Sequence, residues 1–240
     1  MSLPRVRLEH SVQESDSVWV LDGEQGRHLL TVRRCRDGEF FEGLLPGRRI
    51  LLRLETCGTL ARGVKVRETP EEPMPEIWLL AGLLKGDSFD RLLSQSVEVG
   101  ASVIVPLVCT RSVPILEPSK IARKMERWKK ITLEASKQCC APTPTRILDP
   151  VGISSLGSLP VPSARFVAVA GASSKISEFS PPGTAAVATG PEGDWTEEEI
   201  HILQQHDFIP VNLGLRVMRA HTAAVVAVAF LALLSGGQKL

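Results

Sequence analysis

Apolar residues follow two different rhythms on the two sides of a stretch that is rich in proline and glutamate. This stretch, Glu68 to Glu76, reads ETPEEPMPE and holds three prolines and four glutamates. Such a composition favours extended backbone and leaves little to bury, so we expect a linker there. The sequence therefore predicts two domains, covering residues 1–70 and 75–240.

Short apolar runs separated by glycine and proline turns fill the N-terminal domain. Runs of this length and spacing predict modest strands, with one short helix among them. The expected strands are 18–21, 39–42, 49–54 and 63–67, and the expected helix is 28–34. Together they indicate a small, strand-rich barrel or sandwich.

Strands and helices alternate in the C-terminal domain. Ile77–Leu83 and Val103–Val108 are continuous apolar runs, as in strands that are covered on both faces. The other expected elements are helices at 88–99 and 119–139 (with Ser119 as N-cap), strands at 165–170 and 185–189, a helix from 196, a strand at 208–213 and a helix from 219. This alternation predicts an α/β fold with a mostly parallel sheet.

The composition argues against several classes of protein. The chain has 240 residues, 43% of them hydrophobic, which is enough for a real core. Its five cysteines include no CxxC pair, so neither a disulfide framework nor a zinc site is indicated. The first residues hold no apolar signal core, and the most apolar segment, 222–234, is too short to cross a bilayer. We therefore expect a cytoplasmic protein with no metal and no membrane association.

The most informative segment is AAVATGPEGDWTEEEI, residues 185–200. A buried strand ends in a glycine turn, and the following helix has Thr196 and Glu199 at the spacing of a capping box. Turns at the carboxyl ends of parallel strands are where α/β proteins bind ligands. Acidic residues surround this turn and no phosphate-binding motif is present, so a neutral or cationic ligand fits better than a polyphosphate. The alternative is a plain strand-to-helix turn whose acids answer the helix dipole.

A second strand also ends in a glycine. Gly214 follows the expected strand 208–213, and two arginines and a helix of small residues come next. The two glycine turns can lie side by side at one sheet edge and form one pocket. The small residues of the helix either pack the core or allow the close approach of another helix, including one from a second subunit.

Positive charge is concentrated in particular segments of the chain, although the net charge is only +1. Between Lys120 and Lys137 there are seven lysines and arginines but only two acids. A solvated helix face is the ordinary meaning of such a pattern. Its sign bias, together with the arginines of the N-terminal domain, favours contact with the phosphates of RNA. No GxSxG or HExxH motif supports a hydrolase.

At these segments the sequence resembles the RsmE family, which methylates N3 of a uridine in bacterial 16S ribosomal RNA and belongs to the SPOUT class of methyltransferases. Five motifs occur in the order of the family: HLLTVRRCRDGEFFEG, LLKGDSFDRLLSQSVEVGASVIVPLVCTRSV, RWKKITLEASKQCCAPTPTRI, GPEGDWTEEEI and LGLRVMRAHTA. Each motif is weakly specific alone, but five in order are strong evidence.

The resemblance implies a β-rich, PUA-like RNA-binding domain followed by a SPOUT-type knotted α/β methyltransferase domain that works as a homodimer. The implied cofactor is S-adenosylmethionine, and the implied partner is 16S ribosomal RNA or the small ribosomal subunit. The positions that match the family's cofactor loops are Ala170, Gly171, Thr189, Gly190, Pro191, Glu192, Gly193, Asn212, Leu213, Gly214, Val217 and Met218. The expected RNA contacts are His28, Arg33, Arg34 and Arg111, to which the basic helix adds Lys124 and Arg127.

The implied reaction is the in-line transfer of a methyl group from a sulfonium to uridine N3, for which the two reactants must be held aligned. Because N3 carries a proton, the site must also favour the anion of the base. Arg216 and Arg219 are expected to stabilise negative charge on the flanking carbonyls. His221 is a candidate base, since histidine titrates near neutrality; a histidine that merely starts the helix is the alternative.

The sequence departs from the family pattern near the expected catalytic end. Asp194 replaces a second glycine, Ala141-Pro142 an Arg-Asn pair, Ala220-His221 a Thr-Glu pair, and Ser94-Gln95 a Gln-Lys pair. These departures leave two alternatives open. One is a catalytically weakened RNA-binding protein that serves ribosome assembly, and the other is a methyltransferase for another RNA nucleoside.

Overall fold

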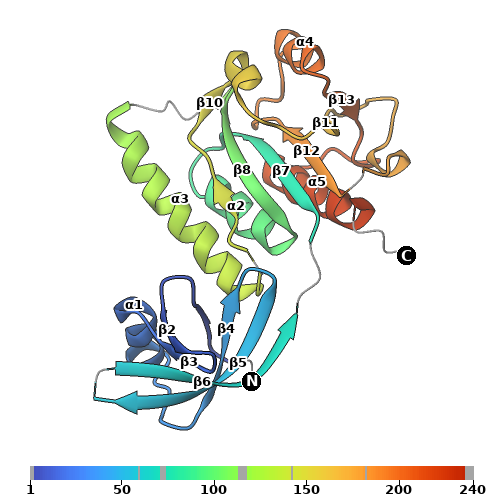
Figure 1. Cartoon of the computed structure of the whole chain (residues 1–240). Helices are drawn as coiled ribbons and strands as arrows, with labels where there is room; N and C mark the ends of the chain where they lie inside the picture. The colour runs from blue at the N-terminus through green and yellow to red at the C-terminus, as the bar shows by residue number, and fades with distance from the viewer. Residues whose placement is uncertain are drawn as a thin grey trace. The chain divides into compact units, whose positions relative to one another are not determined.

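The chain folds into two compact units in this computed structural model, which describes residues 3–58, 60–70, 74–112, 118–141, 143–181 and 183–235 (Figure 1). The N-terminal unit comprises residues 1–73 together with 140–143, and the C-terminal unit comprises 74–139 and 144–240. The position of Pro142, singled out above, lies outside the described residues, as does part of the expected linker at 71–73.

The N-terminal unit is built on one mixed sheet of six strands in the order β1-β4-β5-β6-β3-β2. β1 runs parallel to β4, and the other neighbouring strands are antiparallel. The strands are β1 (Arg5–Arg7), β2 (Val12–Ser15), β3 (Val18–Val20), β4 (Phe40–Leu45), β5 (Arg48–Cys57) and β6 (Leu60–Pro70). The sequence predicted β3 to β6 but not β1 and β2. β6 also runs into the expected linker as far as Pro70, where it pairs with Arg48.

Side chains on one face of this sheet form the core of the N-terminal unit. Along β5, Ile50, Leu52 and Leu54 are fully buried at alternate positions, as the two-residue repeat of a strand requires. They pack in a cluster with Trp19 and Phe41. The short helix expected at 28–34 begins earlier than predicted. It starts as α1 (Gly23–Arg27), where Asp22 caps the first turn, and continues as a π-helical turn, η1 (His28–Val32).

The C-terminal unit has a seven-stranded sheet in the order β10-β8-β7-β12-β11-β13, with β9 pairing β8. Every pairing in it is parallel, which confirms the predicted α/β architecture. The strands are β7 (Glu76–Gly82), β8 (Ala101–Val108), β9 (Arg146–Ile147), β10 (Val151–Gly152), β11 (Arg165–Ala168), β12 (Thr184–Thr189) and β13 (Ile209–Val211). β9 and β10 were not predicted, since two residues are too few to show a pattern.

Both faces of this sheet are covered, which explains the continuous apolar runs in its strands. Ile77, Leu79 and Val187 point to one face, where they pack in a cluster with residues of three helices. These helices are α2 (Ser88–Glu98), α3 (Pro118–Gln138) and α5 (Ala220–Ser235). The other face packs against α4 (Glu197–Gln205) and the short 3-10 helix η2 (Ile153–Ser158). A further 3-10 turn, η3 (Ile176–Glu178), follows β11.

The predicted boundaries of α3 and β11 also differ from those in the structure. α3 begins at Pro118, so Ser119 lies inside the helix and is not its N-cap. Proline suits this first helical position, where its missing N–H needs no partner. β11 ends at Ala168, two residues earlier than expected, and residues 169–171 form a loop.

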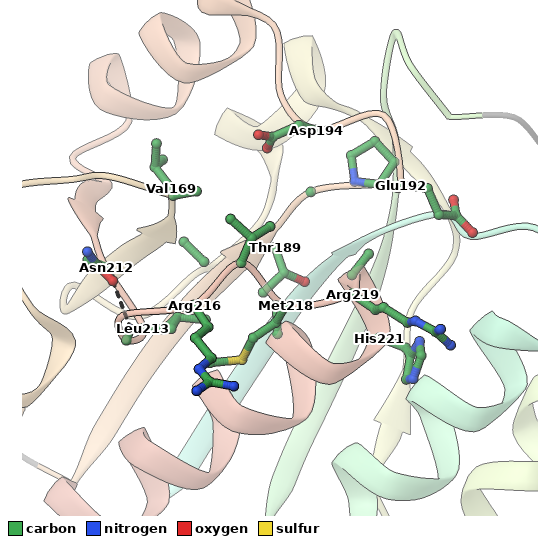
Figure 2. A pocket seen from close by; sticks show the side chains of 18 of the residues that line it. Val169, Thr189, Glu192, Asp194, Asn212, Leu213, Arg216, Met218, Arg219 and His221 are labelled. Carbon is green, nitrogen blue, oxygen red and sulfur yellow. Dashed lines mark hydrogen bonds between the residues drawn. The ribbon is translucent and has the colours of Figure 1, made fainter.

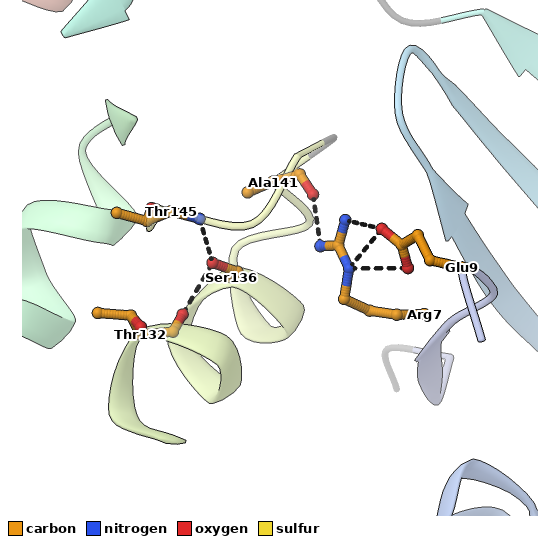
Figure 3. A network of polar contacts seen from close by, with 6 residues as sticks. All are labelled: Arg7, Glu9, Thr132, Ser136, Ala141 and Thr145. Carbon is orange, nitrogen blue, oxygen red and sulfur yellow. Dashed lines mark hydrogen bonds and ion pairs between the residues drawn. The ribbon is translucent and has the colours of Figure 1, made fainter. Parts of the chain in front are cut away.

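Hydroxyl groups fix the chain where it leaves α3 and returns to the sheet (Figure 3). The Ser136 hydroxyl donates to the Thr132 carbonyl oxygen at 2.8 Å and accepts from the Thr145 backbone N–H at 3.3 Å. The Thr145 hydroxyl donates to the Ala101 carbonyl oxygen at 2.6 Å. Within the N-terminal unit, Arg7 pairs with Glu9 at 2.7 Å and donates to the Ala141 carbonyl oxygen at 3.2 Å.

No helix among the described residues is long and apolar enough to span a membrane. They also contain no group of three or more His, Cys, Asp or Glu side chains arranged to hold a metal ion.

We predict that Thr145→Val lowers the free energy of unfolding by about 1–3 kcal/mol, because it leaves the buried Ala101 carbonyl without its hydroxyl donor. Urea unfolding followed by tryptophan fluorescence measures the change. Thr145→Ser is the matched control, since it keeps the hydroxyl, and an equal loss in both variants would contradict this role.

Candidate functional site

A pocket of about 610 Å³ opens at the carboxyl ends of β11, β12 and β13 (Figure 2). Three loops line it: residues 168–171 after β11, 189–194 after β12 and 212–219 between β13 and α5. Leu84, Ser88 and Arg91 come from the turn after β7 and from α2, and Ala220, His221 and Ala223 of α5 complete the lining. The carboxyl ends of parallel strands converge here, which is the usual ligand position in an open α/β sheet.

The two glycine turns that the sequence singled out line this one pocket, as predicted. Their neighbour Gly82, at the end of β7, explains how closely the backbone approaches there. A Cβ atom on Gly82 would lie 2.6 Å from the Pro191 nitrogen and 2.8 Å from the Gly190 carbonyl carbon. Only a glycine therefore lets the loop after β12 cross the end of β7. This requirement was not predicted, because Gly82 lies inside an apolar run of the sequence.

Four hydrogen bonds hold the loop after β12 in place. The Glu192 carboxylate accepts from the Lys85 backbone N–H at 2.9 Å, and the Trp195 indole N–H donates to the Ala168 carbonyl oxygen at 3.1 Å. The Arg111 guanidinium donates to the carbonyl oxygens of Gly193, at 3.2 Å, and Trp195, at 3.1 Å. These contacts preorganise the backbone of the loop, so its conformation does not depend on a bound ligand.

Gly193 belongs to this loop but does not line the pocket. A Cβ atom there would lie 2.8 Å from the Cβ of Arg111, so the residue packs against that arginine. The prediction that placed Gly193 among the cofactor contacts therefore has no support from its position. We infer instead that Gly193 shapes the loop by allowing it to pack against Arg111.

The helix that follows the loop has the predicted cap. The Thr196 hydroxyl accepts from the Glu199 backbone N–H, and the Glu199 carboxylate accepts from the Thr196 backbone N–H, which together form a capping box. The same carboxylate accepts from the Thr110 backbone N–H at 2.7 Å. Burial, reinforced by Glu199, raises the pKa of the nearby Cys109 thiol to about 12, so this cysteine supplies no thiolate nucleophile at neutral pH.

The second glycine loop begins at a fixed point. Asn212 pairs with Lys175 in an isolated bridge, and its side-chain oxygen accepts from the Gly214 N–H at 2.7 Å. Gly214 has φ +153°, a conformation that side chains rarely adopt. Beyond it, Leu215 and Val217 are 101% and 88% exposed, so the loop presents apolar side chains to the surroundings.

The chemistry of the lining suits a nucleoside that carries positive charge. Thr189 is 1% exposed, and its hydroxyl finds no hydrogen-bond partner anywhere in the described residues. A buried polar group without a partner is costly, so it marks a place where a ligand can supply one. Val169, Leu213 and Met218 add apolar surface, and Glu192 and Asp194 add carboxylates (Figure 2). The residues present therefore fit S-adenosylmethionine.

All the residues that the sequence assigned to cofactor or catalysis, except Gly193, line the pocket. Arg216 and Arg219 lie on opposite sides of Met218, and His221 lies beside Arg219 (Figure 2). The positions of Leu84, Ser88 and Arg91 at the pocket were not predicted from the sequence. The available signal was the Lys85-Gly86-Asp87 turn, which follows a third strand whose carboxyl end lies at the same sheet edge.

The expected RNA contacts are divided between the two units. Arg33 and Arg34 are exposed on the N-terminal unit, where Arg34 has φ +56°, and His28 is half-buried. On α3, Lys124 is half-buried and Arg127 pairs with Asp90 and, at 3.8 Å, with Asp87. Arg111 braces the glycine loop. Contact of these residues with RNA stays a prediction.

Comparison with known proteins agrees with this geometry. A family model described as "RNA methyltransferase domain" matches residues 70–232. The chain is 28% identical to the ribosomal RNA small subunit methyltransferase E of Bacillus subtilis, over 92% of each protein. It is 33% identical to that of Synechocystis sp., over 85% of this chain and 69% of the relative.

A similar solved structure supports the same grouping. The crystal structure of a ribosomal RNA small subunit methyltransferase E from Neisseria gonorrhoeae, bound to S-adenosyl methionine, superposes with a TM-score of 0.83 at 26% identity. The match covers 95% of this chain and 96% of the other. The chain therefore belongs to the ribosomal RNA small subunit methyltransferase E family, the RsmE family of the sequence analysis.

Proposed function

We propose that this protein transfers a methyl group from S-adenosylmethionine to N3 of a uridine in 16S ribosomal RNA. The observation that carries the proposal is the pocket in which two glycine loops surround the unpartnered Thr189 hydroxyl. Membership of the family supports the reaction type and the ribosomal RNA substrate.

Backbone and carboxylate groups of the two loops hold the cofactor in this proposal. When bound, S-adenosylmethionine supplies an electrophilic methyl group on a sulfonium. Thr189 hydrogen-bonds the ligand, while Glu192 and Asp194 balance its positive charge. Leu213 and Met218 cover its apolar parts. Because the loops are already fixed by hydrogen bonds, they lose little conformational entropy when the cofactor binds.

The basic groups around Met218 serve the base to be methylated. Arg216 and Arg219 stabilise the negative charge that develops on the uracil carbonyl oxygens when N3 loses its proton. His221 lies next to Arg219 and accepts that proton as a general base (Figure 2). These three residues touch the substrate in the proposal and are its catalytic residues.

The N-terminal unit supplies RNA affinity as a PUA-like domain. Arg33 and Arg34 are exposed in its loop between η1 and β4. Phosphate contacts from these residues, from His28 and from Lys124 and Arg127 of α3 attract RNA without reading its sequence. The cytoplasm, where ribosomes are assembled, is the corresponding place of action.

A second copy of the chain completes the molecule. Leu215 and Val217 are almost wholly exposed, and fully exposed apolar side chains beside a pocket favour a protein contact. We therefore assign a homodimer and, from the resemblance of the RsmE family to the SPOUT class, a knotted methyltransferase domain.

Thr189→Val should weaken the binding of S-adenosylmethionine roughly three- to tenfold, the worth of one hydrogen bond. Isothermal titration measures it. The free energy of unfolding should not fall, because the hydroxyl lost has no partner within the protein. Thr189→Ser is the matched control and should bind nearly as the wild type does. Unchanged affinity in Thr189→Val would contradict the assigned contact.

Deleting the gene should remove one N3-methyluridine from 16S ribosomal RNA, and the wild-type gene should restore it. Nucleoside analysis by mass spectrometry measures this. Loss of a different methylated nucleoside would support the alternative target. An unchanged profile would support the RNA-binding assembly factor, the alternative that the departures at 141, 142 and 221 leave open.

A further inference from the structure

Opposite charges enter the pocket from different elements. The carboxylates, Glu192 and Asp194, come from the loop after β12, and both already accept backbone N–H groups, from Lys85 and Trp195. The basic groups, Arg91, Arg216 and Arg219, come from α2 and from the loop before α5. None of these three guanidinium groups has a hydrogen bond or ion pair within the described residues.

Arg91 lies at the pocket because of the way α2 is rotated about its axis. Ser88 and Arg91 are three residues apart, so they share the face of the helix that lines the pocket. Phe89, Leu92 and Leu93 are buried and fix the rotation of the helix. Arg91 is therefore held at the pocket by the packing of its own helix, although its side chain is exposed.

The acids nearest to Arg91 in the sequence do not neutralise it. Asp90 and Asp87 both pair with Arg127 of α3. Arg91 thus keeps a full, unpaired positive charge at the pocket. An arginine in this state is suited to a phosphate, whose oxygens accept two parallel N–H bonds from the planar guanidinium.

We propose that Arg91 binds a backbone phosphate of the RNA next to the nucleotide that enters the pocket. The inference rests on the proposed function, since it takes the pocket to hold a cofactor and a target base. The phosphate belongs to RNA because each nucleotide brings one to within a few ångströms of its base. Arg91 is accordingly a substrate-binding residue that positions the target, with no part in the proton transfer.

The carboxylate of the cofactor is the competing partner for Arg91, and the two can be separated by experiment. An RNA contact leaves the affinity for S-adenosylmethionine unchanged and alters the salt dependence of RNA binding. A cofactor contact does the reverse. The salt dependence also distinguishes a phosphate contact from a merely structural role, which would not change the number of counterions released.

The test compares Arg91→Gln with Arg146→Gln, a matched loss of one charge. Arg146 lies opposite Val103 in the pairing of β9 with β8, at the amino-terminal end of the sheet and away from the pocket, and forms an ion pair with Glu76 at 3.5 Å. Binding of labelled 16S ribosomal RNA is measured over a range of salt concentrations, and binding of S-adenosylmethionine by titration. The readout is binding, so it stands even if the wild type shows no turnover.

For Arg91→Gln we expect RNA affinity to fall about tenfold or more, as for the loss of one hydrogen-bonded charge pair. A plot of log affinity against log salt concentration should become less steep, its negative slope decreasing in magnitude by about 0.7 to 0.9. Arg91→Lys should keep most of the slope and recover part of the affinity, since a lysine retains the charge but not the paired N–H groups. Arg146→Gln should leave the slope unchanged.

An unchanged slope in Arg91→Gln, the same change in Arg146→Gln, or a weakened affinity for S-adenosylmethionine would each overturn the proposal. Failure of the proposed function looks different. In that case the wild-type protein itself does not bind S-adenosylmethionine, or the methylation of ribosomal RNA does not depend on it.

Discussion

The parallel pairing of β7, β12, β11 and β13 is the constraint on which the pocket depends. Because these strands run in one direction, their carboxyl ends meet at one edge, and the loops that leave them have to share that space. The backbone packs so closely at Gly82 that any side chain there would collide with the backbone of Gly190 and Pro191. The ligand site is thus a consequence of strand order and of a few residues without side chains.

The loops are fixed by hydrogen bonds within the protein. Arg111, Lys85 and Ala168 hold the loop after β12 through its carbonyls, its carboxylate and its tryptophan. Asn212 does the same for the loop before α5. Thr189 is the exception, a buried hydroxyl at the pocket with no partner among the described residues. That contrast between satisfied surroundings and one unsatisfied group is the physical basis for placing a ligand there.

Much of this architecture could be predicted from the sequence, and the misses have physical reasons. The two glycine turns were predictable because each follows a buried apolar strand. Gly193 was placed in the pocket because spacing along the chain does not show which way a turn faces, and it packs on Arg111 instead. Arg91 was not predicted as a pocket residue, because helical periodicity identifies the buried face of α2 but not what its exposed face lies next to. β9 and β10 are too short to carry a pattern.

The central claim is that the two glycine loops hold one cofactor between them, and hydrogen exchange measured by mass spectrometry tests it most directly. On addition of S-adenosylmethionine, backbone amides of both 189–195 and 212–219 should become protected together, while those of η2 should exchange as before. Protection of one loop without the other, or of neither, would contradict the account.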